Sequence, residues 1–352
     1  MKKAIFSLIV LGAINLEASI LSEALTEAKQ SGQIRVGAVE IEDDRGEKTS
    51  TLALGATLGV ESKEVYGISL GATFYTTNAL FGKNSEGMFL SSEGESYSIV
   101  GESYIKANLG KTTIKAGRQI IDTPYANSDD RGMIPNSFEG VTLLNQDIKD
   151  TTVLLASLDK WSGIDSDNPE KFTKLQTSKD AVIMASVIYE GVDNTTLQAW
   201  HYRLDDADFN YFEAGYEREQ FNLGFQYTTQ DNDNTAFGLH AGLNIGKLSL
   251  TTAYNKVDGI VSNGFGGGPF FTSAEKQTIE SDELDEEGIL VSAEYTVDKL
   301  TLALVHAHFK KGENNTDYIM NYSVNDNHSL ELIYSNIYND DTMVRFFANY
   351  NF

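Results

Sequence analysis

Short segments in which apolar and polar residues alternate recur along most of this chain, and they restrict its fold more than any other feature. Within residues 52–60, leucine, alanine and valine alternate with small or hydroxyl residues, and residues 221–228, 237–245 and 289–296 repeat the two-residue period. Such a period places one set of side chains on each face of a β-strand. From Gln33 to Phe352 we count about eighteen such segments, and only residues 20–30 show a helical pattern.

The connections between these segments differ in length in a regular way. Residues 246–247 and 298–299 form tight connections, whereas long ones cover residues 77–96, 123–137, 162–179 and 258–287. In an up-and-down barrel of antiparallel strands, short turns gather at one end and longer loops at the other. The pattern therefore predicts an all-β antiparallel barrel of about eighteen strands.

The apolar face of these strands is expected to point outward, toward lipid. A barrel of about eighteen strands encloses too wide an interior for side chains to fill, so its lumen holds water and its polar face lines it. The last strand fits this arrangement, because Val344, Phe346, Ala348, Tyr350 and Phe352 share one face and the chain ends on an aromatic residue. Tyr350 and Phe352 are expected in the aromatic girdle at the periplasmic interface, where the assembly machinery for outer-membrane barrels would recognise the strand. The alternative is a secreted, soluble β-rich protein.

The N-terminus resembles an export signal. Lys2 and Lys3 precede an apolar run over residues 4–14, and Ala18 supplies a small residue for cleavage. The sequence thus predicts a cleaved signal peptide at residues 1–18, a short periplasmic helix or segment at 19–32, and a transmembrane barrel at 33–352. The expected location is the outer membrane of a Gram-negative cell.

The composition and the missing motifs argue against several other classes of protein. The chain has no cysteine, so it forms neither disulfides nor thiolate metal sites. Its net charge of −24 argues against sequence-independent binding of nucleic acid. No nucleophile elbow, HExxH or Walker motif is present, and we expect neither enzymatic activity nor a cofactor. The acidic segments 165–170 and 280–287 are interpreted as solvated outer loops, with binding of divalent cations such as Ca²⁺ or Mg²⁺ as the alternative. The pair His306 and His308 could bind a metal but lacks a nearby carboxylate on its strand, and no metal site is assigned.

One long connection breaks the two-residue rhythm and carries a family resemblance. The stretch from Gly117 to Asn145, GRQIIDTPYANSDDRGMIPNSFEGVTLLN, contains two prolines and the run Asp129-Asp130-Arg131. It resembles the OprD family of bacterial outer-membrane porins, most closely members from Campylobacter-type bacteria. The resemblance implies an eighteen-stranded barrel whose third outer loop narrows the channel. It also implies diffusion of small polar solutes, often carboxylates, although this chain lacks the abundant arginine and lysine of carboxylate-selective relatives.

Charged residues of this loop and the facing wall are expected to form the constriction, where they tune which ions pass. These residues are Arg118, Asp122, Asp129, Asp130, Arg131 and Glu139. Ion pairs that merely hold the loop on the wall are the alternative, and strict alternation from Ile114 would turn Arg118 outward. Other candidates for the lumen lie on the polar phase of their strands: Gln226, His240, Asn244, Glu294, Glu331 and Arg345.

The function predicted from the sequence is a porin that lets small hydrophilic solutes and ions diffuse passively across the outer membrane. Its expected partners are these solutes, outer-membrane lipid and lipopolysaccharide. A surface adhesin or a structural anchor is the alternative function. The sequence leaves the sign of ion selectivity open, and it allows either a monomer or a trimer.

Overall fold

The computed structural model describes residues 18–82, 88–176, 180–205, 207–231, 233–279, 284–337 and 341–352. A single short helix, α2, covers Ala18–Thr26 in this part of the chain. The strands are β1 (Lys29–Glu42), β2 (Lys48–Glu61), β3 (Ile68–Gly82), β4 (Tyr97–Leu109), β5 (Thr112–Gln119), β6 (Ser137–Asn145), β7 (Thr151–Ser162), β8 (Thr173–Lys174), β9 (Val182–Val192), β10 (Thr195–Arg203), β11 (Asp208–Glu217), β12 (Phe221–Gln230), β13 (Asn234–Ile245), β14 (Leu248–Asp258), β15 (Glu287–Val297), β16 (Leu300–Phe309), β17 (Asn315–Ser323), β18 (His328–Ile337) and β19 (Thr342–Asn351).

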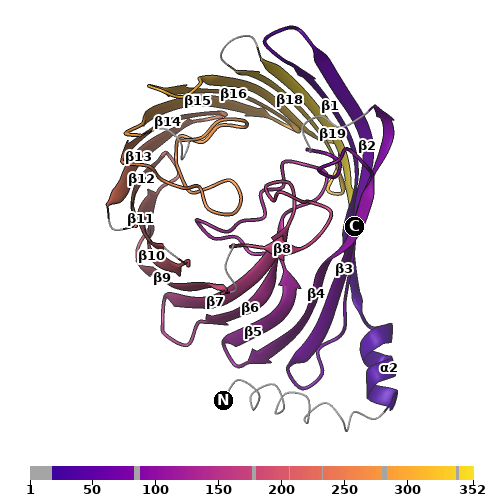
Figure 1. Ribbon diagram of the computed structural model, residues 1–352. Coiled ribbons are helices and arrows are strands. Elements are labelled where there is room, and N and C mark those ends of the chain that lie inside the picture. The colour runs from indigo at the N-terminus through magenta and orange to yellow at the C-terminus, as the bar shows by residue number, and fades with distance from the viewer. Residues whose placement is uncertain are drawn as a thin grey trace.

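The strands form one closed wall (Figure 1). Each wall strand pairs antiparallel with the next one along the chain, and β1 pairs with β19 to close the sheet. Strand β8 has two residues and pairs only with Lys160 and Trp161 of β7. The other eighteen described strands make up the wall, so the predicted eighteen-stranded up-and-down barrel is confirmed.

The last strand illustrates why the alternating sequence suits this wall. Met343, Arg345 and Phe347 point inward and are only 1–3% exposed, because loops inside the barrel cover them. Val344 and Tyr350 point outward and are 36% and 39% exposed. Many other leucine, valine and aromatic side chains on the outer face are equally uncovered. A continuous apolar belt of this kind is unfavourable in water and fits lipid.

Helix α2 lies outside the wall, at the end of the barrel with the short turns (Figure 1). Lys63 of the β2–β3 turn pairs with Glu23 and Glu27 of this helix at 2.8 and 2.9 Å. Strand β1 begins at Lys29, so the barrel starts earlier than the predicted Gln33. Residues 1–17 lie outside the described residues, and the signal peptide stays a prediction. Among the described helices, none has the length and apolar character needed to span a bilayer.

The described parts of four longer connections fold into the barrel (Figure 1), and we name these connections by their order among the outer loops. They are L2 (residues 83–96), L3 (120–136), L4 (163–181) and L7 (259–286). Three clusters of buried apolar side chains hold their described parts against the inner wall. The interior near the outer mouth is therefore a packed assembly of loops, which narrows a wide barrel.

Candidate channel constriction

One side of L3 is held on the inner face of β1 and β2. Arg35 of β1 pairs with Asp130 through two contacts of 2.8 and 2.9 Å, and its guanidinium also donates to the carbonyl of Gly132. Met133 packs on the wall where Gly55 offers no side chain, since a Cβ there would lie 3.0 Å from the Met133 methyl carbon. A bidentate arginine–carboxylate pair is geometrically specific, so this contact fixes the position of L3 along the wall.

The other side of L3 is held on the opposite stretch of wall by Tyr125. Its ring is 1% exposed and packs edge-on at 5.3 Å against both Tyr202 of β10 and Phe209 of β11. The Tyr125 hydroxyl donates to Thr228 Oγ1 at 2.7 Å and accepts from Gln230 Nε2 at 3.1 Å. L3 therefore crosses the lumen from β1 to β12, as the family resemblance implies for the third outer loop.

An arginine joins L3 to L4. The guanidinium of Arg131 donates to Asp165 of L4 at 2.6 Å and pairs with Asp129 of its own loop at 3.2 Å. Asn136 donates to the second oxygen of Asp165, also at 2.6 Å. Arg131 and Asn136 thus hold the Asp165 side chain in a fixed position beside the opening, and Asp129 and Asp165 hold Arg131.

Backbone pairing joins L3 to L7. Ala126 forms a parallel bridge with Phe265, whose amide donates to the carbonyl of Tyr125 at 2.9 Å. The amide of Asn127 donates in turn to the carbonyl of Phe265 at 3.0 Å. The two loops therefore form one continuous partition inside the barrel.

L7 is also fixed to the wall at three places. Gln226 of β12 donates to the Pro269 carbonyl at 2.8 Å, and the Glu275 amide donates to Asp317 of β17 at 3.0 Å. The Glu275 carboxylate forms an ion pair with Arg345 of β19, which donates at 3.1 Å to the carbonyl of Arg131 as well. Arg345 is the side chain through which β19 holds both L3 and L7.

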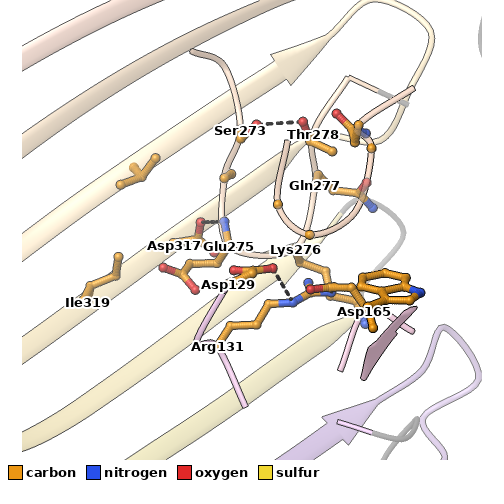
Figure 2. A pocket seen from close by; sticks show the side chains of 17 residues that line it. Asp129, Arg131, Asp165, Ser273, Glu275, Lys276, Gln277, Thr278, Asp317 and Ile319 are labelled. Carbon is orange, nitrogen blue, oxygen red and sulfur yellow. Dashed lines mark hydrogen bonds and ion pairs between the residues drawn. The ribbon is translucent and has the colours of Figure 1, made fainter. Parts of the chain in front are cut away.

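A cavity of about 490 Å³ lies between L3, L4, L7 and the inner faces of β16 and β17 (Figure 2). Figure 2 shows Asp129 and Arg131 on one side of it and Glu275 and Lys276 of L7 on the other. Its charged lining comprises four carboxylates and two cations: Asp129, Asp165, Glu275, Asp317, Arg131 and Lys276. Opposed charges across such a narrow space act on any ion that passes.

The most perturbed acid of this cavity is Asp129. Burial raises the pKa of Asp129 to about 6, and the neighbouring carboxylate of Asp165 adds to the rise, while Arg131 opposes it. Burial alone would lower the pKa of Arg131, but Asp165 and Asp129 outweigh it and raise that pKa, so the guanidinium stays charged. The cavity therefore changes its charge in the mildly acidic range.

Four of the six residues predicted for the constriction lie in L3. Asp129 and Arg131 line the cavity, and Asp130 fixes L3 to β1. Asp122 is exposed and accepts hydrogen bonds from the amide and hydroxyl of Ser128 at 3.0 and 2.7 Å, which shapes L3 locally.

Arg118 and Glu139 correct the sequence-based prediction. They are cross-strand neighbours on β5 and β6, in the same phase as Val141, which is 47% exposed on the outer face. Their placement at the constriction was therefore wrong. Arg118 lies within β5, and the long loop begins only after that strand ends. The strict alternation of the strand therefore still applies to Arg118 and turns its side chain outward.

All six predicted lumen residues share the inward phase of their strands, but loops cover two of them. Gln226 and Arg345 are 2% and 1% exposed beneath L7. His240 meets the ring of Phe271 edge-on at 4.7 Å, and Glu331 is only partly exposed. Glu294 and Asn244 stay exposed near the turn end of the barrel.

The two terminal aromatic residues point outward together. The Tyr350 ring stacks at 4.7 Å on His328, and Phe352 lies 5.7 Å from Tyr350. Both are exposed at the turn end of the wall, and their place in an interfacial girdle stays a prediction.

Several residues that shape the site were not predicted. Arg35 could have been found, because it is a charged residue between the apolar Ile34 and Val36 on a strand. Asp165, Glu275 and Lys276 lie in long connections without periodicity, so no sequence signal brings them together. Within the described residues, no group of three or more His, Asp or Glu is arranged to hold a metal ion.

A closed barrel with an apolar outer belt, a polar interior and an inward-folded third loop defines a channel of the bacterial outer membrane. The model of the OprD family of outer membrane porins matches residues 56–268, and the chain belongs to this family. It is a porin through which small solutes diffuse across the outer membrane.

Solved structures share this fold at low sequence identity. Pseudomonas aeruginosa OpdK, determined with vanillate, superimposes with a TM-score of 0.80 at 18% identity, over 93% of this chain and 99% of its own. A BenF-like porin from Pseudomonas fluorescens gives 0.80 at 16% identity over 94% and 99%, and Pseudomonas aeruginosa OccK8 (OprE) gives 0.79 at 15% over 94% and 99%. A comparison with curated proteins finds no match.

Proposed function

We propose that solutes pass through the cavity between L3, L4 and L7, and that its charges favour cations over anions. The observation that carries the proposal is the lining itself, in which four carboxylates face two cations. Including the buried Arg345 behind Glu275 still leaves the carboxylates in excess. At pH above the pKa of Asp129, the opening is therefore net negative.

The proposed preference for cations distinguishes this channel from one that conducts carboxylates. OpdK was determined with vanillate, an aromatic carboxylate. A carboxylate entering this cavity would meet the carboxylates of Asp129 and Asp165. The positive charge of Arg131 is already paired with both of them. A small ammonium or metal cation would instead be attracted to these oxygens.

Single-channel recording in a planar bilayer under a KCl gradient tests the proposal. We expect discrete conductance steps. We also expect a reversal potential whose sign shows that cations carry most of the current. D129N should move the reversal potential toward the anion side, and K276E should move it the other way. E139Q removes an acid from the outer face and serves as the matched control, with no shift expected.

An anion-selective wild type would contradict the proposed preference while leaving the channel itself intact. A folded barrel without conductance would favour the alternative function, a surface adhesin or structural anchor. We also propose that the protein has no catalytic activity.

The proposal extends to how the protein reaches the membrane. We infer that residues 1–18 are cleaved, which N-terminal sequencing of the mature protein would test. We also infer that the assembly machinery reads the terminal strand with Tyr350 and Phe352. Cross-linking of the membrane-inserted protein would distinguish a monomer from a trimer.

A further inference from the structure

Two clusters of the same design lie on the outer face of the barrel. In cluster 1, Glu139 pairs with both Arg118 and Lys160, at 3.0 and 2.9 Å. Cluster 2 consists of Lys256, Glu287 and Lys310, and both lysines approach the same Glu287 oxygen, at 3.7 and 3.5 Å. Cluster 1 spans β5, β6 and β7, and cluster 2 spans β14, β15 and the residue that follows β16. Each cluster carries two positive charges and one negative charge.

Both clusters sit at the loop end of the apolar belt. Val141 follows Glu139 by two residues on the same face and is 47% exposed, and Ile289 follows Glu287 in the same way and is 48% exposed. Two residues of a strand span about 7 Å. The charged groups therefore lie at about the depth where acyl chains give way to headgroups.

The cations retain binding capacity. Side chains of Lys256 and Lys310 are 48% and 62% exposed, and those of Arg118 and Lys160 are 33% and 35% exposed. An ammonium has three N–H donors and a guanidinium has five, so one shared carboxylate leaves donors unused.

Arg118 is also held in place before any ligand arrives. Its guanidinium donates to the Val100 carbonyl at 3.0 Å and lies 4.1 Å from the centre of the Phe172 ring. A cation that is already ordered loses little conformational entropy on binding.

We propose that each cluster binds a phosphate of the phosphorylated glycolipid in the outer leaflet, lipopolysaccharide. The inference rests on the outer-membrane location and is independent of the ion preference of the channel. A phosphate oxygen would lie across the two cations of a cluster, where charge-assisted hydrogen bonds are strong. In a chain with a net charge of −24, two local surfaces of net positive charge at this depth select an anionic headgroup.

The barrel contains a natural contrast to these clusters. Lys48, near the loop end of β2, pairs with Glu40 and Glu42 at 3.1 and 3.0 Å. Here one cation faces two carboxylates, so this group is net negative and should not attract phosphate. Lys48→Ala is therefore the matched control for loss of an outer cation.

Native mass spectrometry of the full-length mature protein, refolded from inclusion bodies in zwitterionic detergent, tests the proposal. The probes are bisphosphorylated lipid A and the same lipid after removal of both phosphates. We expect up to two tightly bound lipid A molecules in the wild type and one in either R118A/K160A or K256A/K310A. Each cation near an anionic headgroup accounts for roughly fivefold in affinity, so each double variant should weaken its site about 25-fold.

A second set of variants distinguishes a lipid-binding role of the clusters from a purely structural one, by the direction in which lipid A affinity changes. E139Q and E287Q remove the competing carboxylate and should strengthen lipid A binding, while K48A should leave it unchanged. Inorganic phosphate should compete weakly, because it gains no acyl contacts with the belt. Equal binding of the dephosphorylated lipid, or unchanged binding by folded protein that lacks all four cations, would overturn the proposal.

Discussion

Removing the positive charge of Arg345 should loosen the partition inside the channel. This side chain is 1% exposed, forms an ion pair with Glu275 of L7 and donates to the Arg131 carbonyl of L3 at 3.1 Å. Arg345→Met keeps a similar length but leaves the Glu275 carboxylate without its cation. Both loops then lose the polar contact with β19 that this one side chain provides.

The magnitude follows from the burial of the two partners. Breaking a fully buried ion pair costs about 3–5 kcal/mol. Glu275 is 29% exposed and water can replace part of the lost contact, so we expect about 2–3 kcal/mol. That change raises the population with L7 detached from β19 roughly 30- to 140-fold.

Two assays report this detachment. In single-channel recordings, R345M should show larger and noisier open currents than the wild type. Limited trypsin digestion should cleave L7 at Lys276 faster in the variant. R203M removes an exposed arginine of the outer face and is the matched control. Unchanged current noise together with unchanged cleavage in R345M would refute the assignment of Arg345 as the anchor of both loops.

Further predictions concern the remaining contacts of L3. Lowering the pH from 7.5 to 5 should protonate Asp129, because its pKa is raised to about 6, and the cation preference should fall; D129N should show no such step. Since that pKa is raised on folding, the carboxyl favours the folded state in acid and this contribution is lost as the pH rises through about 6. Gly55→Leu should press on Met133 and lower barrel stability by about 1–3 kcal/mol, measured from the melting midpoint in detergent. Tyr125→Phe should cost about 1–2 kcal/mol in the same assay, through two lost hydrogen bonds. R118A should leave the reversal potential unchanged, because Arg118 lies on the outer face, and a shift would place it in the conduction path.

The barrel wall could be predicted from the sequence because the pattern that specifies it lies within each strand. A two-residue period decides which side chains of a strand face lipid, and the register of β19 against β1 preserves that period throughout. The same rule places the Arg118 side chain on the outer face. The prediction that Arg118 lines the constriction was wrong because it followed the family resemblance instead of the alternation.

The partners of L3 could not be derived, because they lie on distant segments. Asp165 and Glu275 meet Arg131 and Arg345 only after L4 and L7 fold inward, and neither loop has a periodic pattern that fixes its path. The charges of L3 were visible in the sequence. Whether they faced an opening or a binding partner depended on distant contacts, from Arg131 to Asp165 across 34 positions and from Asp130 to Arg35 across 95.

The seam between β1 and β19 has a consequence for the order of events during barrel assembly. Arg35 and Asn349 bond across it from positions 314 residues apart, and the amides of Gly32 and Phe352 each donate to the carbonyl of the other at 3.0 Å. Until β19 pairs with it, β1 has one exposed edge with unpaired backbone groups, and such an edge is prone to aggregation. A chain in which only β19 is still unpaired would have all of L3 and nearly all of its wall, yet no closed ring. Closure joins strands from the two ends of the barrel segment, and contacts at such sequence separation form slowly.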